Sequence, residues 1–150
     1  DHLALADGER TRIRIPDRPS LMADYGKNGF LPERGSVVDL TDLVDASRGD
    51  PILLSYFSAL REQIQQTANR QPWLEGELDE GLVYVSFQLL ASGTVEDVRI
   101  VSDRSAPSET LQETAARIVM AAAPFPAFPP SMASEPSQTI VVPLEFLLGS

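Results

Sequence analysis

Side chains that could carry out chemistry are scarce in this sequence. Histidine occurs once, as His2, so neither a Ser-His-Asp arrangement nor a histidine-rich metal site has anything to build on. Two acidic pairs, Glu75 with Glu77 and Asp79 with Glu80, could in principle bind calcium or serve as acid and base. Such a run is more often a solvated loop, and EF-hand spacing, zinc motifs and glycine-rich phosphate loops are absent. We therefore expect no enzyme activity, metal or cofactor.

Composition narrows the class of partner. The 150 residues are 43% hydrophobic, which is enough for one folded core plus an extension. Twenty-two acidic and twelve basic residues give a net charge of −10, which disfavours nucleic acid and anionic membrane surfaces. The absence of cysteine excludes disulfides and thiolate chemistry. No apolar run is long enough to span a bilayer, so we expect any signal or anchor segment to lie outside these residues.

The chain divides into a lead-in and a folded domain. Residues 1–35 are rich in proline and glycine and show only a short strand-like alternation from Ile13 to Ile15, so we expect an extended lead-in or linker. An arm packed on the main domain is the alternative, through the apolar residues Leu21, Met22, Phe30 and Leu31. Residues 36–150 are predicted to form the domain.

A helix is predicted between Asp50 and Pro72. Asp50 suits the N-cap, and Pro51 suits the first helical position. The apolar residues that recur at helical spacing are Leu53, Tyr56, Phe57, Leu60, Ile64 and Ala68. The side chains predicted to lie on the opposite, solvated side are Arg61, Glu62, Gln65 and Gln66.

Alternating residues predict a hairpin next. Gly81 opens a strand whose helix-covered face is predicted to carry Val83, Val85, Phe87 and Leu89. Gly93 supplies turn chemistry before a second strand that ends near Ser102. Val95 is out of phase with Val98 and Ile100, which indicates a bulge near Glu96 and Asp97.

A second helix and a third strand complete the domain. Thr110 and Glu113 have the spacing of a capping box, and Pro124 ends the apolar helical stripe that follows. The third strand is predicted from about Gln138, with its core face formed by Ile140, Val142, Leu144, Phe146 and Leu148.

Pro143 predicts where the third strand lies in the sheet. Proline has no N–H to donate, so an apolar strand tolerates it where the missing donor faces solvent, at a sheet edge. A split β-α-β connection then gives the sheet order 2-1-3. The predicted fold is α+β, with the order α-β-β-α-β, a three-stranded antiparallel sheet, two helices on one face and an extended N-terminal arm.

An edge strand can accept a guest strand through its outward backbone groups. The residues predicted to bind a partner are Gln138, Thr139, Ile140, Val141, Val142, Pro143, Leu144 and Glu145. Trp73 joins them as an aromatic anchor beside a proline. The alternative is that this strand is only an edge strand and binds nothing.

Several spaced motifs match a known family. They are Tyr56-Phe57 with Arg61 and Ile64, the alternating strand from Gly81 to Phe87, the strand from Gly93 to Ser102, Leu111 with Ala115-Ala116, Ala123-Pro124-Phe125-Pro126 with Phe128-Pro129, and Val142-Pro143-Leu144 with Phe146. Together these residues resemble the C-terminal domain of TonB-family energy transducers, over about residues 36–148.

The resemblance implies a function. Members of that family are anchored in the inner membrane, span the periplasm and present this domain to a segment of an outer-membrane transporter or other envelope protein, which pairs with the last strand. It further implies coupling to an inner-membrane proton-driven motor. The nearly lysine-free lead-in departs from the family's linkers and leaves the partner open. The alternative is a TolA-like envelope scaffold or homodimerisation domain that transduces nothing.

Overall fold

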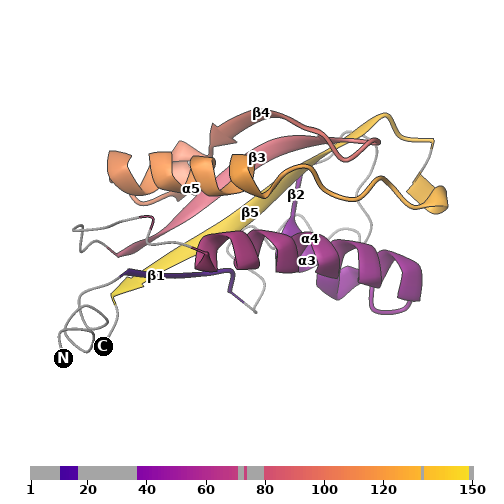
Figure 1. The fold of residues 1–150 in the computed structure, drawn as a ribbon, viewed down its shortest axis with the longest axis horizontal. Helices are drawn as coiled ribbons and strands as arrows, with labels where there is room; N and C mark the ends of the chain where they lie inside the picture. Colours follow the sequence, from indigo (N-terminus) through magenta and orange to yellow (C-terminus); the bar gives the residue numbers. More distant parts are fainter. Residues whose placement is uncertain (1–10, 17–36, 71–72, 74–79, 133, 149–150) are drawn as a thin grey trace.

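The computed structural model describes residues 11–16, 37–70, 73, 80–132 and 134–148. A twisted sheet forms one layer, and helices α4 and α5 lie across one of its faces (Figure 1). The strands are β1 (Thr11–Arg14), β2 (Val37–Asp39), β3 (Gly81–Leu90), β4 (Val95–Ile100) and β5 (Ser137–Leu148). The helices are α3 (Leu40–Ala46), α4 (Pro51–Asn69) and α5 (Glu109–Ala122), with short 3-10 turns η2 (Ser102–Arg104) and η3 (Pro130–Met132).

Side-chain caps fix where the helices begin. Asp50 accepts hydrogen bonds at its Oδ1 from the amides of Ile52 and Leu53, at 3.1 and 3.2 Å, so the predicted start of α4 is confirmed. Helix α5 begins earlier than predicted: Ser108, not Thr110, is its N-cap, and its Oγ accepts from the Leu111 amide at 3.2 Å.

The strand order is β1-β5-β3-β4, and β2 also pairs with β5. The predicted order of the three C-terminal strands is confirmed, because β3 lies between β4 and β5 in antiparallel pairing. The predicted three-stranded antiparallel sheet is wrong in two respects. Strands β1 and β2 extend it beyond β5, and β2 pairs with β5 in parallel. The short helix α3 was also not predicted.

A bulge resets the register of the hairpin. Ser86 pairs with Arg99 and Gln88 pairs with Glu96, so one residue of β3 faces two of β4. Asp97, in the extra position, has a φ of 58°. The bulge predicted at Glu96 and Asp97 is confirmed.

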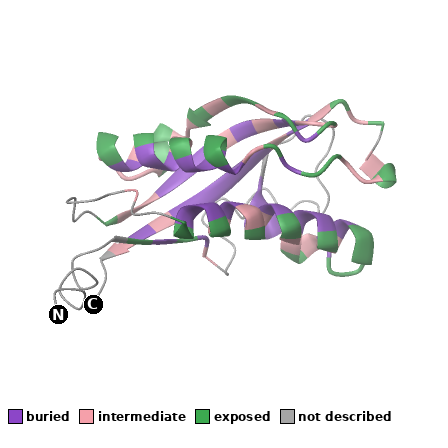
Figure 2. Cartoon of the chain, viewed as in Figure 1, coloured by how far each residue is buried: buried purple, intermediate pink, exposed green. Residues whose placement is uncertain are grey.

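The core lies between the sheet and helices α4 and α5, as the buried inner faces in Figure 2 show. Alternate residues of β3 and β5 enter it, as predicted: Val83, Val85, Phe87 and Leu89, together with Ile140, Val142, Leu144 and Phe146. The intervening Tyr84 and Val141 form a smaller cluster on the other face.

The loop after α5 is held against the hairpin and α4. The Phe125 amide donates to the Gly93 carbonyl at 2.9 Å, and a Cβ at Gly93 would lie 1.9 Å from the Phe125 oxygen. With a φ of +97° as well, this position requires glycine. The Tyr56 hydroxyl donates to the Pro126 carbonyl at 2.8 Å, and burial raises the pKa of Tyr56 to about 12. These contacts set the path by which the chain reaches β5.

Candidate functional site

The inner side of β5 is paired with β3 along most of its length. Its ladder with β3 runs continuously from Ser137 opposite Leu90 to Phe146 opposite Gly81. Tyr84 shows which backbone groups take part: its amide donates to Ser105 Oγ and its carbonyl accepts from the Val101 amide, both away from β5. Because hydrogen bonding alternates along antiparallel strands, the even-numbered residues of β5 face β3 and the odd-numbered residues face outward. This is the parity that Pro143 predicted.

The outer side of β5 is also paired, so the prediction that β5 is an edge strand is wrong. Strand β1 runs antiparallel to the end of β5, with Arg14 opposite Glu145 and Arg12 opposite Leu147. Strand β2 runs parallel to its beginning, with Asp39 opposite Val141. Both segments come from the N-terminal part of the chain.

Pro143 occupies the interval between these two segments. The pairing with β2 ends at Val141, and the pairing with β1 begins at Glu145. The missing N–H of Pro143 faces this interval, where neither segment requires a donor. The physical argument from the proline therefore holds locally, although it was wrongly extended to the whole strand.

The structure leaves none of the predicted β5 residues open on its outer side except in that interval. Ile140, Val142 and Leu144 are core residues, and Val141 is fully buried on the other face. Thr139 and Val141 pair with β2. Gln138 is buried, and its side-chain amide donates to the Thr139 carbonyl at 3.2 Å. Their role in binding a partner stays a prediction.

Trp73 is remote from these contacts. It is half-buried against the core, and its Nε1 donates to the Thr67 carbonyl of α4 at 3.2 Å. The Arg117 guanidinium of α5 lies 5.5 Å from its ring centroid. The structure thus brings Trp73 together with the two helices, not with β5.

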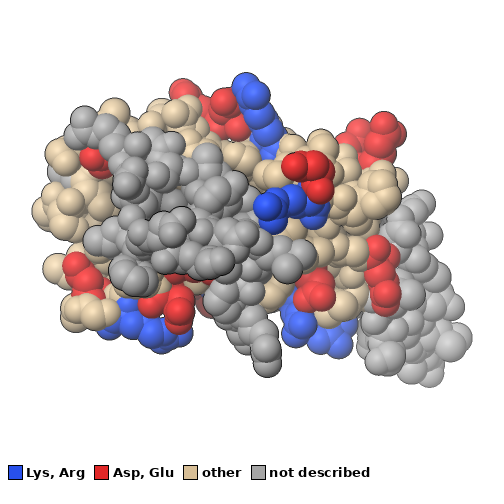
Figure 3. All heavy atoms as spheres, turned by 180° about the vertical axis from the view of Figure 1, so that it is seen from behind, with Lys and Arg blue, Asp and Glu red and all other residues tan. Residues whose placement is uncertain are grey.

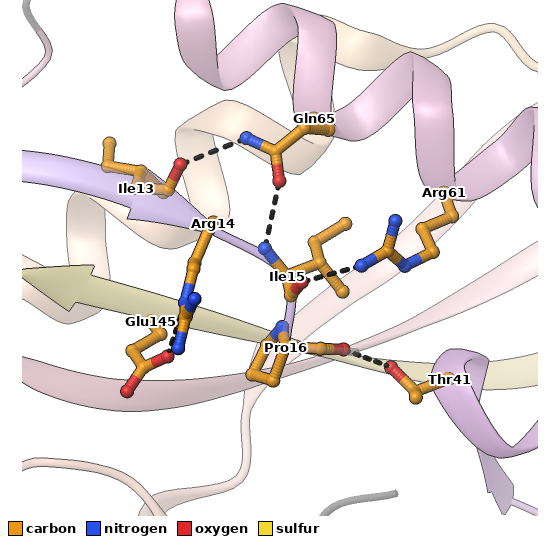
Figure 4. Close-up of polar contacts among 8 residues, drawn as sticks. All are labelled: Ile13, Arg14, Ile15, Pro16, Thr41, Arg61, Gln65 and Glu145. Atoms are coloured by element: carbon orange, nitrogen blue, oxygen red, sulfur yellow. Dashed lines mark hydrogen bonds and ion pairs between the residues drawn. The ribbon is translucent and has the colours of Figure 1, made fainter. Parts of the chain in front are cut away.

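Side chains of α4 hold the outer edge of β1, as Figure 4 shows. Gln65 donates from Nε2 to the Ile13 carbonyl and accepts at Oε1 from the Ile15 amide, both at 2.9 Å. Arg61 donates to the Ile15 carbonyl at 2.7 Å. The prediction that Arg61 and Gln65 lie on the solvated side of α4 is wrong. Arg61 and Gln65 lie one turn apart at the border of the apolar face of α4. This spacing is the feature of the sequence that could have indicated a shared contact.

Two further contacts attach this segment. Arg14 and Glu145 form an ion pair at 2.9 Å across β1 and β5. The Thr41 hydroxyl of α3 donates to the Pro16 carbonyl at 3.3 Å. We refer to residues 12–16 as the arm.

The arm is held by a small margin. Burial of Ile13 and Ile15 contributes about 3–6 kcal/mol, at about 1.5–3 kcal/mol each. Fixing the backbone of the five residues of the arm, at about 1–2 kcal/mol each, costs about 5–10 kcal/mol. The remaining stabilisation comes from hydrogen bonds, at about 0.5–1.5 kcal/mol each. Burial alone therefore does not outweigh the cost of ordering the arm, and its hydrogen bonds decide how firmly it is held on β5.

A buried carboxylate lies beside the β2 segment. Asp42 of α3 is buried, and its Oδ2 has no hydrogen-bond partner. Burial, and then the charges of Asp39 and Asp45, raise the pKa of Asp42 to about 6. Asp39 accepts from the Thr41 amide at 2.8 Å and caps α3.

We looked for a metal site and a membrane span among the described residues. They contain no cluster of three or more histidine or acidic side chains placed to hold a metal ion, and none of their helices is long and apolar enough to cross a membrane. On the face seen in Figure 3, acidic and basic side chains of the described residues are interspersed. Residues His2, Glu75, Glu77, Asp79, Leu21, Met22, Phe30 and Leu31 lie outside the described part.

Comparisons with known proteins agree with this fold. No curated protein sequence matches the chain. The solution structure of the Helicobacter pylori TonB C-terminal domain aligns with a TM-score of 0.50 and 24% identity, covering 65% of this chain and 84% of that one. The family model of the Gram-negative bacterial TonB protein C-terminal domain matches residues 77–148, from just before β3 to the end of β5. The resemblance to the TonB C-terminal domain that the spaced motifs predicted is therefore confirmed over residues 77–148.

Proposed function

We propose that this chain is the periplasmic module of an energy transducer, which binds an extended segment of an outer-membrane transporter or other envelope protein along β5. The observation that carries the proposal is the outer side of β5. It pairs with two short extended segments that are distant in sequence, one antiparallel and one parallel. Its outward backbone groups thus pair with an antiparallel strand at one end and a parallel strand at the other, which is the kind of contact that strand addition uses.

The family resemblance supports the wider role. A TonB C-terminal domain couples its partner to a proton-driven motor in the inner membrane through segments that precede the domain, and we propose the same for this chain. Anchoring in the inner membrane and location in the periplasm belong to this proposal. Binding through backbone groups suits such a role, because it tolerates varied partner sequences while alternate side chains supply specificity.

Cysteine cross-linking tests the strand addition. The chain has no cysteine, so Glu145→Cys is its only thiol. Peptides covering candidate partner segments would each carry one cysteine, moved a residue at a time. Strand pairing predicts disulfides at alternate peptide positions only, because side chains alternate between faces.

Arg99→Cys is the matched control. Arg99 is exposed on β4, at the far side of the sheet, and should give no position-dependent cross-link. Cross-linking that is absent from Glu145→Cys in every register, or equal for both variants, would refute strand addition. A stable dimer in sedimentation velocity with no peptide binding would instead favour the homodimerisation alternative.

A further inference from the structure

The arm occupies the same backbone groups that the proposed partner needs. Arg14 and Arg12 lie opposite the outward-facing Glu145 and Leu147. Figure 4 shows the arm lying between β5 and the side chains of α4. A partner segment that pairs with this half of β5 must therefore displace the arm.

The arm has the form of a bound peptide. Ile13 and Ile15 are 9% and 2% exposed, whereas Arg12, before them, and Arg14, between them, are exposed. This alternation is that of an extended segment with one buried face. The site consequently buries two apolar side chains that lie two residues apart on an extended segment.

Gln65 binds main-chain groups of the arm, so its hydrogen bonds do not depend on the side chains of the arm. The Gln65 side-chain amide donates to the Ile13 carbonyl and accepts from the Ile15 amide, as the peptide groups of a neighbouring strand would, and its other N–H donates to Asn69 Oδ1 at 3.2 Å. Arg61 adds a bond to another main-chain oxygen, that of Ile15. Any extended segment with the same backbone path would satisfy these contacts equally well.

We propose, building on the proposed function, that the arm is an internal competitor for the partner site and that the partner segment replaces it strand for strand. The replacing segment runs antiparallel to β5 and carries apolar residues at two alternate positions. Gln65 and Arg61 then bind the partner's main chain in place of the arm's.

The ion pair defines the position between the two apolar residues. Glu145 lies beneath Arg14 at 2.9 Å, so a basic or neutral polar residue suits this position and an acidic one is repelled. The partner pattern is therefore apolar, basic or polar, apolar. The arm and the α4 residues that hold it lie outside the family-matched residues 77–148.

A reversible lock tests the inference in the full chain. Arg14→Cys and Glu145→Cys, combined, place two thiols directly opposite each other and close a disulfide on oxidation. The probe is a fluorescein-labelled peptide of residues 9–18, ERTRIRIPDR, so no partner needs to be known. We expect the reduced protein to bind this peptide and the oxidised protein to bind it at least about tenfold more weakly, because the competent state is removed.

Ser86→Cys with Arg99→Cys is the matched control lock. These residues are also directly opposite, but on β3 and β4, so its oxidation should leave peptide binding unchanged. Equal binding to the oxidised and reduced forms of the arm lock would overturn the inference. So would failure of the reduced protein to bind the peptide.

Variant probes test the predicted pattern. A peptide with serine in place of both isoleucines should lose binding. In the parent chain, which keeps Glu145, glutamate in place of the arginine between the isoleucines should weaken binding more than glutamate in place of the arginine before them. If all these peptides bind equally well, then neither burial of the two isoleucines nor the contact with Glu145 determines which segment binds, and the inference fails.

Gln65→Leu tests the clamp without any peptide. In a glutathione buffer, the fraction of the arm lock that is oxidised reports how often the arm lies on β5. We expect Gln65→Leu to lower the equilibrium constant for closure several-fold. Gln66→Leu, on the exposed side of the same helix, should not change it. Equal closure in both variants would overturn the role of Gln65.

The inference and the proposed function can fail separately. A second disulfide, between Arg12→Cys and Leu147→Cys, can hold the arm on β5 while Glu145→Cys remains free to react. A partner segment that cross-links to Glu145→Cys in that state would support strand addition and overturn competition. A chain that binds the arm peptide, while no envelope segment displaces it, would uphold the competitor and count against the proposed function.

Discussion

The two sides of β5 differ in how they are built. The side facing β3 carries one continuous ladder whose alternate side chains enter the core. The side facing away carries two short segments, of four and three residues, with Pro143 between them. One strand thus joins a permanent partner on one side and replaceable partners on the other. Position in a sheet does not by itself tell how firmly a strand is held.

Truncation of a core side chain on the side facing β3 should cause the largest loss in the free energy of unfolding. Phe87→Ala removes a fully buried ring of β3 that stacks on Phe125 with centroids 6.1 Å apart. We expect a loss of about 3–5 kcal/mol in the free energy of unfolding, measured with urea. Met120→Ala, at an exposed position of α5, should change it by less than about 0.5 kcal/mol. Similar losses for both would contradict the assigned core.

The replaceable side should release locally. Ile15→Ala weakens the arm, and we expect a loss of about 2 kcal/mol, at the low end for such a substitution because the arm can leave before the core unfolds. Amide hydrogen exchange should quicken at Glu145 and Leu147, which face β1, and stay unchanged at Val142 and Leu144, which face β3.

Ile100→Ala is the control for this release. Ile100 is a half-buried isoleucine of β4, at the opposite side of the sheet. It should leave exchange at Glu145 and Leu147 unaltered. If Ile15→Ala instead quickens exchange in both sets of β5 amides, the arm and the core unfold as one unit.

The free energy of unfolding should depend on pH through Asp42, which lies in α3, directly after β2. Its pKa is raised from 3.8 to about 6 in the folded chain, so between these values the folded state holds the extra proton. The stability contributed by this group is therefore complete below about pH 4 and is lost as the pH rises through 6. Asp42→Asn should be more stable than the parent by about 1–2 kcal/mol at pH 7.5, with the difference shrinking at pH 4.

Urea unfolding at both pH values checks this difference. Glu113→Gln is the control, since Glu113 is an exposed carboxylate on α5 and is not among the charges that raise the pKa of Asp42. A difference between Asp42→Asn and the parent that is independent of pH would show that the buried carboxylate does not titrate as stated.

The smallest effect is expected from the ion pair of the arm. Arg14→Gln breaks its contact with Glu145, and because the Arg14 side chain is 58% exposed the cost should be about 0.2–1 kcal/mol. Arg12→Gln removes the same charge from the same strand and serves as the control. The difference between the two should vanish in 1 M salt, and persistence there would assign the cost to packing instead.

Local signals in the sequence predicted much of the permanent side. Asp50-Pro51 marks the start of α4, alternation assigns the faces of β3 and β5, and Pro143 gives the parity of β5. Each of these depends on neighbouring residues and on backbone chemistry alone. They therefore hold whatever the rest of the chain does.

The replaceable side depended on long-range pairing that local signals do not encode. The alternation from Ile13 to Ile15 was visible, but it is too short to indicate which strand it joins. Gln65 was placed on the solvated side because the helical pattern alone does not show that a distant segment, the arm, covers this part of α4. The division into residues 1–35 and 36–150 stays a prediction, although β1 lies in the first part and packs on the second.

Gln65 has one more consequence, which concerns aggregation. An unpaired outer strand is a template on which further chains can add and build fibrils. By satisfying main-chain groups on the outer row of β1, Gln65 ends the sheet with a side chain that cannot propagate it. At the opposite border, the bulge at Asp97 and the flanking charges of Glu96 and Arg99 serve the same end. We expect both features to hinder polymerisation of crowded molecules through their sheets.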